Sequence, residues 1–333
     1  MSRIERFHPG TKVIEWLSGS ISGPASTYSS GAGYFAGGLG LNAGTIMDTI
    51  DKLVFGSETC AAISATLSTA KRDCGGMSNN GTAGYIGGGY TNTQIDTVEK
   101  LTTPGESRTT LGTGLSVARR EQPAGCANSG TAGYFGGGNE NTDWSSGSFA
   151  IDKFAFSNDS RSVVSDGLSV KVRAPGAMAN SGTAGYWAGG SPNGPTSAVI
   201  DKIAFSNDTR TVLSTGLSEA MYGPAGCANS GTAGYIGGGY APPAHLYQVD
   251  IIAKWAFSND ARTVLSTVLS SERQAPGAAA QSGTAGYWAG GSTGTRVTTV
   301  DKLAFSNDSL TTLGTGLSTT LQHLSGAANS GTL

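Results

Sequence analysis

The residues that could take part in chemistry are few and widely separated. The chain has three histidines and four cysteines among its 333 residues. His8 lies near the amino terminus, His245 in a loop and His323 near the carboxyl terminus. No local cluster therefore offers the imidazole, thiolate and carboxylate ligands from which proteins build metal sites. We expect neither a metal nor another cofactor.

A second group of candidates is the recurring sequence Ser-Asn-Asp, which places an acid at Asp159, Asp208, Asp260 and Asp308. It is loosely similar to the aspartate box of sialidases, but it lacks that motif's glycine and final aromatic residue. Asn and Asp side chains commonly bond the backbone of a tight turn. Glycoside hydrolysis would need a separated pair of carboxyl groups, and no such pair is singled out. We expect capped turns and no enzymatic activity.

Arginines form a third group, because they recur at related places in the chain. They are Arg72, Arg120, Arg173 and Arg273, with Tyr222 in the remaining place. Each could tie its segment to a carbonyl or an acid next door, or together they could hold an anionic ligand. The first alternative predicts that Arg173→Ala lowers stability more than it lowers binding.

The fourth group lies in loops that differ between otherwise similar segments. We predict that six loop residues bind a ligand: Asn139, Asn141, Trp144, Tyr240, His245 and Tyr247. Aromatic faces beside amide and hydroxyl groups suit sugar rings or a protein partner, and loops on a rigid scaffold often carry recognition. Trp144→Ala is expected to weaken binding of that ligand.

The elements that position these residues come from a sixfold internal repeat. A Gly-Tyr-apolar-(Gly/Ala)-Gly-Gly phrase recurs at spacings of 51, 49, 52, 49 and 52 residues. Its tyrosines are Tyr34, Tyr85, Tyr134, Tyr186, Tyr235 and Tyr287. A period near 50 residues is typical of stacked or circular architectures. Residues present in every copy are most simply explained by the fold.

Each repeat reads as four short antiparallel strands. Asn-Ser-Gly separates the first two strands and suits a tight hairpin. The third strand, exemplified by residues 200–205, alternates with a period of two, and Ser-Asn-Asp turns the chain into the fourth. Double glycines such as Gly137-Gly138 and Gly189-Gly190 end the second strand, where only glycine combines close backbone approach with free φ.

Four-stranded units of this length cannot bury their apolar faces alone, so they pack around an axis as the blades of an all-β propeller. The double glycine, the aromatic residue before it and the arginine ahead of the first strand resemble the kelch-repeat family of β-propellers. The resemblance covers about nine-tenths of the chain and implies a fold but no particular activity. A departure is that the fourth strands lack the tryptophan usual in kelch repeats.

The number of blades depends on the two ends of the chain. Residues 4–7 and 11–18 resemble third and fourth strands, and residues 325–332 repeat a first strand. We favour seven blades, the last shared by the two termini, over six. One domain, residues 1–333, then has blades near 23–69, 74–116, 123–169, 173–218, 223–270 and 274–318, and a last one from 323–333 plus 3–20. Since a second strand is missing from that blade, either the blade has three strands or a neighbouring chain, as in an oligomer, supplies the fourth.

Composition narrows the functional classes. Charged residues make up 13% of the chain and the net charge is −2, which offers no basic face for a nucleic acid. No segment has the length and apolarity of a signal peptide or a membrane span. We expect a protein made in a cytoplasm, with no membrane insertion.

The Gly/Ser/Thr-rich repeats resemble those of bacteriophage structural and tail-associated proteins. That resemblance implies a non-enzymatic virion component, in a tail fibre, a baseplate or a surface decoration. Its partners would be a host-surface glycan or other virion proteins. The alternatives are an intracellular bacterial kelch-type adaptor in the cytoplasm and, ranked below it, a carbohydrate-active enzyme.

Overall fold

The computed structural model describes residues 31–40, 44–140, 147–192, 194–242 and 248–328. Within these ranges the chain forms 24 strands in six antiparallel sheets of four strands each. The predicted all-β propeller of four-stranded blades is confirmed. No helix in these ranges is long and apolar enough to cross a membrane.

The six sheets are the blades, and each is given from its inner to its outer strand. Blade one is β24 (Ser325–Ala328), β1 (Ala32–Ala36), β2 (Ile50–Val54) and β3 (Thr59–Ala62). Blade two is β4 (Gly75–Asn79), β5 (Ala83–Gly87), β6 (Val98–Thr102) and β7 (Ser107–Thr110). Blade three is β8 (Ala124–Asn128), β9 (Ala132–Gly136), β10 (Ile151–Ala155) and β11 (Arg161–Val163).

The other three blades follow the same order. Blade four is β12 (Gly176–Asn180), β13 (Ala184–Ala188), β14 (Ile200–Ala204) and β15 (Arg210–Val212). Blade five is β16 (Ala225–Asn229), β17 (Ala233–Gly237), β18 (Ile252–Ala256) and β19 (Ala261–Val264). Blade six is β20 (Gly277–Gln281), β21 (Ala285–Ala289), β22 (Val300–Ala304) and β23 (Ser309–Thr312).

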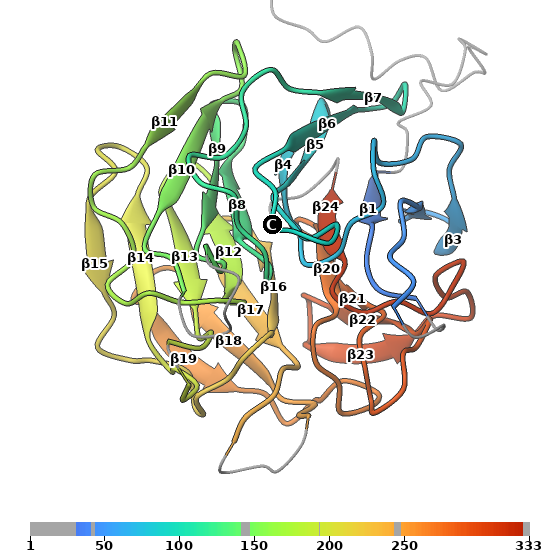
Figure 1. Cartoon of the computed structure of the whole chain (residues 1–333). Coiled ribbons are helices and arrows are strands. Elements are labelled where there is room, and N and C mark those ends of the chain that lie inside the picture. The colour runs from blue at the N-terminus through green and yellow to red at the C-terminus, as the bar shows by residue number, and fades with distance from the viewer. Residues whose placement is uncertain (1–30, 41–43, 141–146, 193, 243–247, 329–333) are drawn as a thin grey trace, which may run out of the picture. The chain divides into compact units, whose positions relative to one another are not determined.

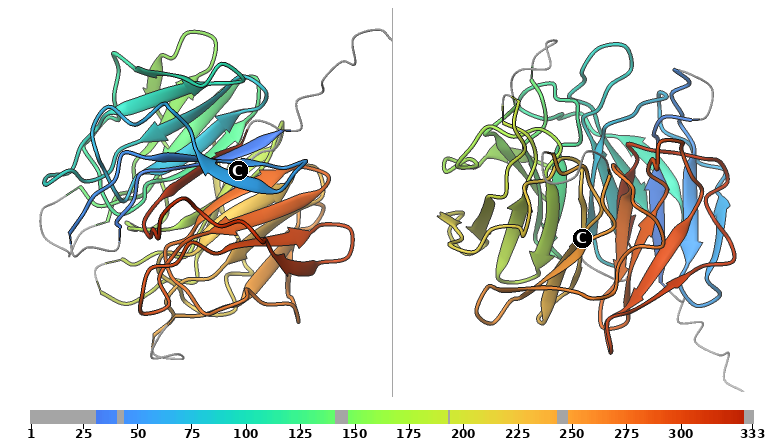
Figure 2. Two further views of the ribbon diagram at one scale, coloured as in Figure 1. Left: turned by 90° about the vertical axis from the view of Figure 1, so that its right-hand side faces the viewer. Right: turned by 90° about the horizontal axis from the view of Figure 1, so that it is seen from below.

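The inner strands form a closed circle, since β4, β8, β12, β16, β20 and β24 each contact the next and β24 contacts β4 (Figure 1). Blade one is completed by the carboxyl-terminal strand: β24 pairs with β1, with Ala327 opposite Tyr34. Figure 2 shows this red strand beside the blue β1.

The structure therefore has six blades, the count that the sequence analysis kept as the alternative to seven. The carboxyl-terminal copy of a first strand finds its missing second strand in β1, so it does not begin a seventh blade. Residues 3–20, which the seven-blade arrangement would use, lie outside the described residues.

The predicted turns and glycines have the expected conformations. Gly130 and Gly182 close the first hairpins of blades three and four at φ of 79° and 82°. The double glycines of these blades also have positive φ: 74° at Gly137, 91° at Gly138, 72° at Gly189 and 89° at Gly190. A side chain is strained in this left-handed region, which explains the choice of glycine.

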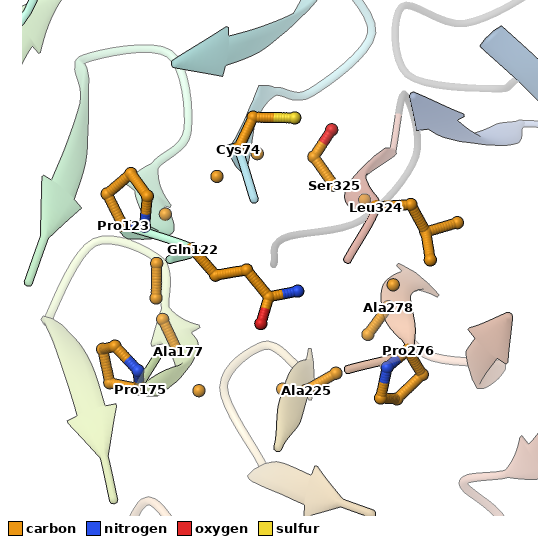
Figure 3. A pocket seen from close by; sticks show the side chains of 18 of the residues that line it. Cys74, Gln122, Pro123, Pro175, Ala177, Ala225, Pro276, Ala278, Leu324 and Ser325 are labelled. Carbon is orange, nitrogen blue, oxygen red and sulfur yellow. The ribbon is translucent and has the colours of Figure 1, made fainter. Parts of the chain in front are cut away.

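The channel between the inner strands is almost filled by backbone. An ideal Cβ on Gly326 would lie 1.8 Å from the carbonyl oxygen of Ala278, and one on Gly76 would lie 2.0 Å from that of Gly326. What remains is a cavity of about 60 Å³, into which the Gln122 side chain points (Figure 3). This space suits a few water molecules, not an organic ligand.

The repeat tyrosines join each blade to the next. Tyr134 of blade three stacks on Phe205 of blade four at a centroid distance of 5.1 Å, and its hydroxyl donates to Asp208 at 2.9 Å. Lys153, opposite Tyr134 in the sheet, donates to the same carboxylate at 2.7 Å. Equivalent Tyr, Lys and acid clusters link the other described blades, closing with Lys302 on Glu58 of blade one.

The Ser-Asn-Asp turns thus have two functions. Asn158 and Asn207 accept from the backbone N–H two residues later, as a turn cap does. The aspartates, at φ of 54–57°, instead reach the preceding blade. The prediction of capped turns is confirmed, but the capping residue is the asparagine.

Candidate functional site

The face that carries the loops between the second and third strands is closed by a ring of backbone hydrogen bonds. Just before each inner strand, one residue donates its N–H to a carbonyl in the neighbouring blade, at distances of 2.7–3.0 Å. The donors are Asp73, Gln122, Ala174, Gly223, Ala275 and His323. All six have positive φ. The ring fixes the side chains around the channel mouth.

One half of this mouth is charged. Asp73 is buried and accepts from Arg72 at 2.9 Å and from Nδ1 of His323 at 2.8 Å. Burial alone would raise the pKa of the Asp73 carboxyl, but the charges of His323, Arg72 and Arg120 lower it below its ordinary value. Asp73 is therefore held as a carboxylate.

Glu121 lies on the same side in a different environment. Its carboxylate accepts from Nη1 of Arg173 at 3.3 Å, while its Oε1 atom is buried and has no hydrogen-bond partner among the described residues. Burial raises the pKa of Glu121, and the charge of Arg173 offsets this only in part. Glu121 therefore neutralises the charge of Arg173 only in part.

The recurring arginines have two kinds of position. Arg72, Arg120 and Arg173 lie at the mouth, where Arg72 and Arg120 both lie over the ring of Tyr90, at 4.9 and 5.3 Å. Arg273 is fully buried one residue earlier in its repeat and pairs with Asp301 at 2.5 Å. Arg173 does pair with an acid of the preceding blade, as one of the two alternatives expected.

The other half of the mouth is open. There the ring residues are the small residues Ala174, Gly223 and Ala275, and an open space lies beside the residues that precede them. This space is a cavity of about 310 Å³. Its described lining consists of Arg173, Ser191, Gly194, Thr196, Tyr222, Tyr240, Pro242 and Gln274. It is large enough for a small organic ligand.

Hydrogen bonds within and between the loops hold the cavity wall in place. The Ser191 hydroxyl donates to the carbonyls of Gly194 and Pro195, and Thr196 donates to that of Pro242. Tyr222 and Tyr240 exchange two backbone hydrogen bonds, at 2.9 and 2.8 Å. The loops of blades four and five, together with the residues that precede the inner strands of blades four to six, therefore present two phenol rings, an amide and a guanidinium around one space.

The loop residues predicted to bind a ligand have different positions. Tyr240 lines the cavity. Asn139 is fully buried, and its backbone exchanges hydrogen bonds with Arg120 at 2.7 and 3.0 Å, so its side chain is not exposed. Asn141, Trp144, His245 and Tyr247 lie outside the described residues.

Sequence reasoning missed Tyr222, Gln274, Ser191 and Thr196 as lining residues. A signal was present, because the position two residues before the inner strand is Ala, Gly and Ala in three successive repeats and polar or charged in the others. Such a run of small residues marks where the mouth is left open.

A metal centre finds no support in the described ranges, where no three His, Cys, Asp or Glu side chains gather as metal ligands would.

Comparison with known proteins supports the propeller fold but indicates no activity. No protein-family model and no curated protein matches this chain. The solved structure of YjhT superimposes with a TM-score of 0.66 at 13% sequence identity, covering 86% of this chain and 97% of that one. At such low identity the likeness shows a shared β-propeller fold and nothing of activity.

Proposed function

We propose that this protein is a binding protein whose recognition surface is the loop face of the propeller. The observation that carries the proposal is the 310 Å³ cavity beside Arg173, Tyr222, Tyr240 and Gln274. Aromatic faces with adjacent hydrogen-bonding groups are well suited to a sugar ring. We take the ligand to be one unit of a cell-surface glycan.

The setting that we propose is a virion component that recognises its host. This rests on the resemblance of the Gly/Ser/Thr-rich repeats to bacteriophage structural proteins. Labelled protein should then bind intact cells of particular bacteria and not of others. Equal binding to all cells, or to none, would contradict host recognition.

The test of the binding role is a glycan array probed with the purified, labelled protein. Tyr240→Ala should reduce binding to any recognised glycan at least tenfold, because it removes one aromatic wall. Tyr90→Ala is the matched control, since Tyr90 follows the glycines of blade two as Tyr240 follows those of blade five. Trp144→Ala tests the loop of blade three in the same assay.

Two results would count against the proposal. Glycan binding that is unchanged in Tyr240→Ala would separate recognition from the cavity. Failure to bind any glycan, together with capture of one soluble protein, would favour the adaptor function instead.

A further inference from the structure

We infer that the ligand held in this cavity carries an anionic group, a carboxylate or a phosphate, that pairs with the guanidinium of Arg173. The inference rests on the proposed binding function and makes it more specific. It starts from the lining: Arg173 is charged, and the other described lining residues are Ser, Gly, Thr, Tyr, Pro and Gln. A ligand in the cavity therefore meets a positive charge with no acid beside it in the described wall.

The Arg173 guanidinium has hydrogen-bonding capacity to spare. It offers five N–H donors. Nη1 reaches Glu121 at 3.3 Å, Nη2 reaches the Ser191 hydroxyl at 3.5 Å, and buried Nε has no partner among the described residues. Both contacts are longer than ordinary N–H···O hydrogen bonds. A carboxylate or phosphate can take two such donors at once.

The guanidinium is also held in place. Its central carbon lies 5.5 Å from the centroid of the Tyr222 ring, which itself lines the cavity. The planar group is thus braced between an aromatic face and Glu121. Lysine provides neither the planar fork nor this stacking.

The carboxylates near Arg173 leave room for an added anion, because, of Asp73 and Glu121, only Glu121 pairs with its guanidinium. Asp73 is engaged by Arg72 and His323. Glu121 remains as the acid bonded to Arg173, and its burial weakens it as a counter-ion.

The experiment measures affinity by titration calorimetry for three probes of similar size: glucose, glucuronate and glucose 6-phosphate. Wild-type protein should bind at least one of the two anionic sugars tenfold or more tightly than glucose. Which of them is preferred distinguishes carboxylate from phosphate. Glu121→Gln should strengthen anion binding, because it removes the competing carboxylate.

Arg173→Lys should abolish most of this preference, so that the ratio of the affinities for the anionic sugar and for glucose falls towards one. Arg72→Lys is the matched control, since Arg72 has the equivalent position in blade two but does not line the cavity. Thermal unfolding of each variant checks that it is folded. If Arg173→Lys fails to fold, the salt dependence of binding and the Glu121→Gln variant still test the inference.

The outcomes separate this inference from the proposed function. Equal affinity for glucose and both anionic sugars would overturn the anionic ligand, and a preference that survives in Arg173→Lys would overturn its pairing with the Arg173 guanidinium. Neutral glycan binding that is lost in Tyr240→Ala would then still support the binding function. No binding of any sugar or glycan would overturn both.

Discussion

At the scale of the residue, buried acids differ in whether a base compensates them. Asp152 is paired with the fully buried Arg119. Asp51 has the same position in blade one, but one of its oxygens accepts from the backbone N–H of Ser318 and the other has no partner among the described residues. Burial raises the pKa of Asp51, which the Ser318 hydrogen bond only partly offsets. The folded state therefore holds this proton more tightly than the unfolded chain.

Asp51→Asn should raise the thermal midpoint at pH 7, because it removes a buried, uncompensated charge. The stability that protonated Asp51 provides is present below its unfolded pKa of about 3.9 and is lost as pH rises through the higher folded pKa. The advantage of the variant should therefore shrink as the pH falls from 7 towards 4. Unfolding followed across this range checks the sign, and a lower midpoint at pH 7 would contradict it.

Asp152→Asn provides the opposite case. It leaves the Arg119 charge buried without its partner, and this kind of change typically costs about 3–5 kcal/mol. Chemical denaturation at pH 7 should show that loss. A cost as small as that of an ordinary surface substitution would mean that another group compensates Arg119.

At the scale of the element, the tyrosine clusters provide a matched pair of variants. Tyr134→Phe removes the hydrogen bond to Asp208, which should cost about 1.5–3 kcal/mol because the acceptor is charged. Tyr287 stacks on Phe55 in the same way, but its hydroxyl is buried with no partner in the described part of the chain, so Tyr287→Phe should be neutral or stabilising. Urea unfolding of both variants tests this, and equal losses would show that stacking alone joins the blades.

Strands and turns were predictable from the sequence where residues close together in the chain determine their conformation. The Asn-Ser-Gly turns, the double glycines and the alternation of residues 200–205 all predicted strands that are present. The contact from Asp208 to Tyr134 was not predictable, because 74 residues separate the two and only the angle between blades brings them together. The same holds for the cavity, whose wall combines the mouth of three blades with two loops. Of its lining, only Tyr240 and Arg173 were candidate ligand-binding residues from the sequence.

At the scale of the whole molecule, the number of blades depends on which strand completes blade one. Sequence shows a first-strand copy at residues 325–332 but not its partner, since the pairing of Tyr34 with Ala327 is a contact between the two ends of the propeller. Counting repeats therefore could not decide between six and seven blades. The circle closes because β24 contacts β20 on one side and β4 on the other.

This closure predicts that the propeller depends on its last strand. Deletion of residues 323–333 removes β24 and exposes one edge of β1, so the free energy of unfolding should fall by more than about 4 kcal/mol, a loss typical of severe core lesions. A synthetic peptide of residues 323–333 should restore stability, with a midpoint that rises with peptide concentration. The same peptide with Gly326→Val should fail, because a Cβ there would meet the Ala278 carbonyl at 1.8 Å. Equal stability of the shortened and the full chain would show that β24 is not what closes the propeller. The ring of backbone hydrogen bonds at the mouth and the contact of Lys302 with Glu58 would then have to close it.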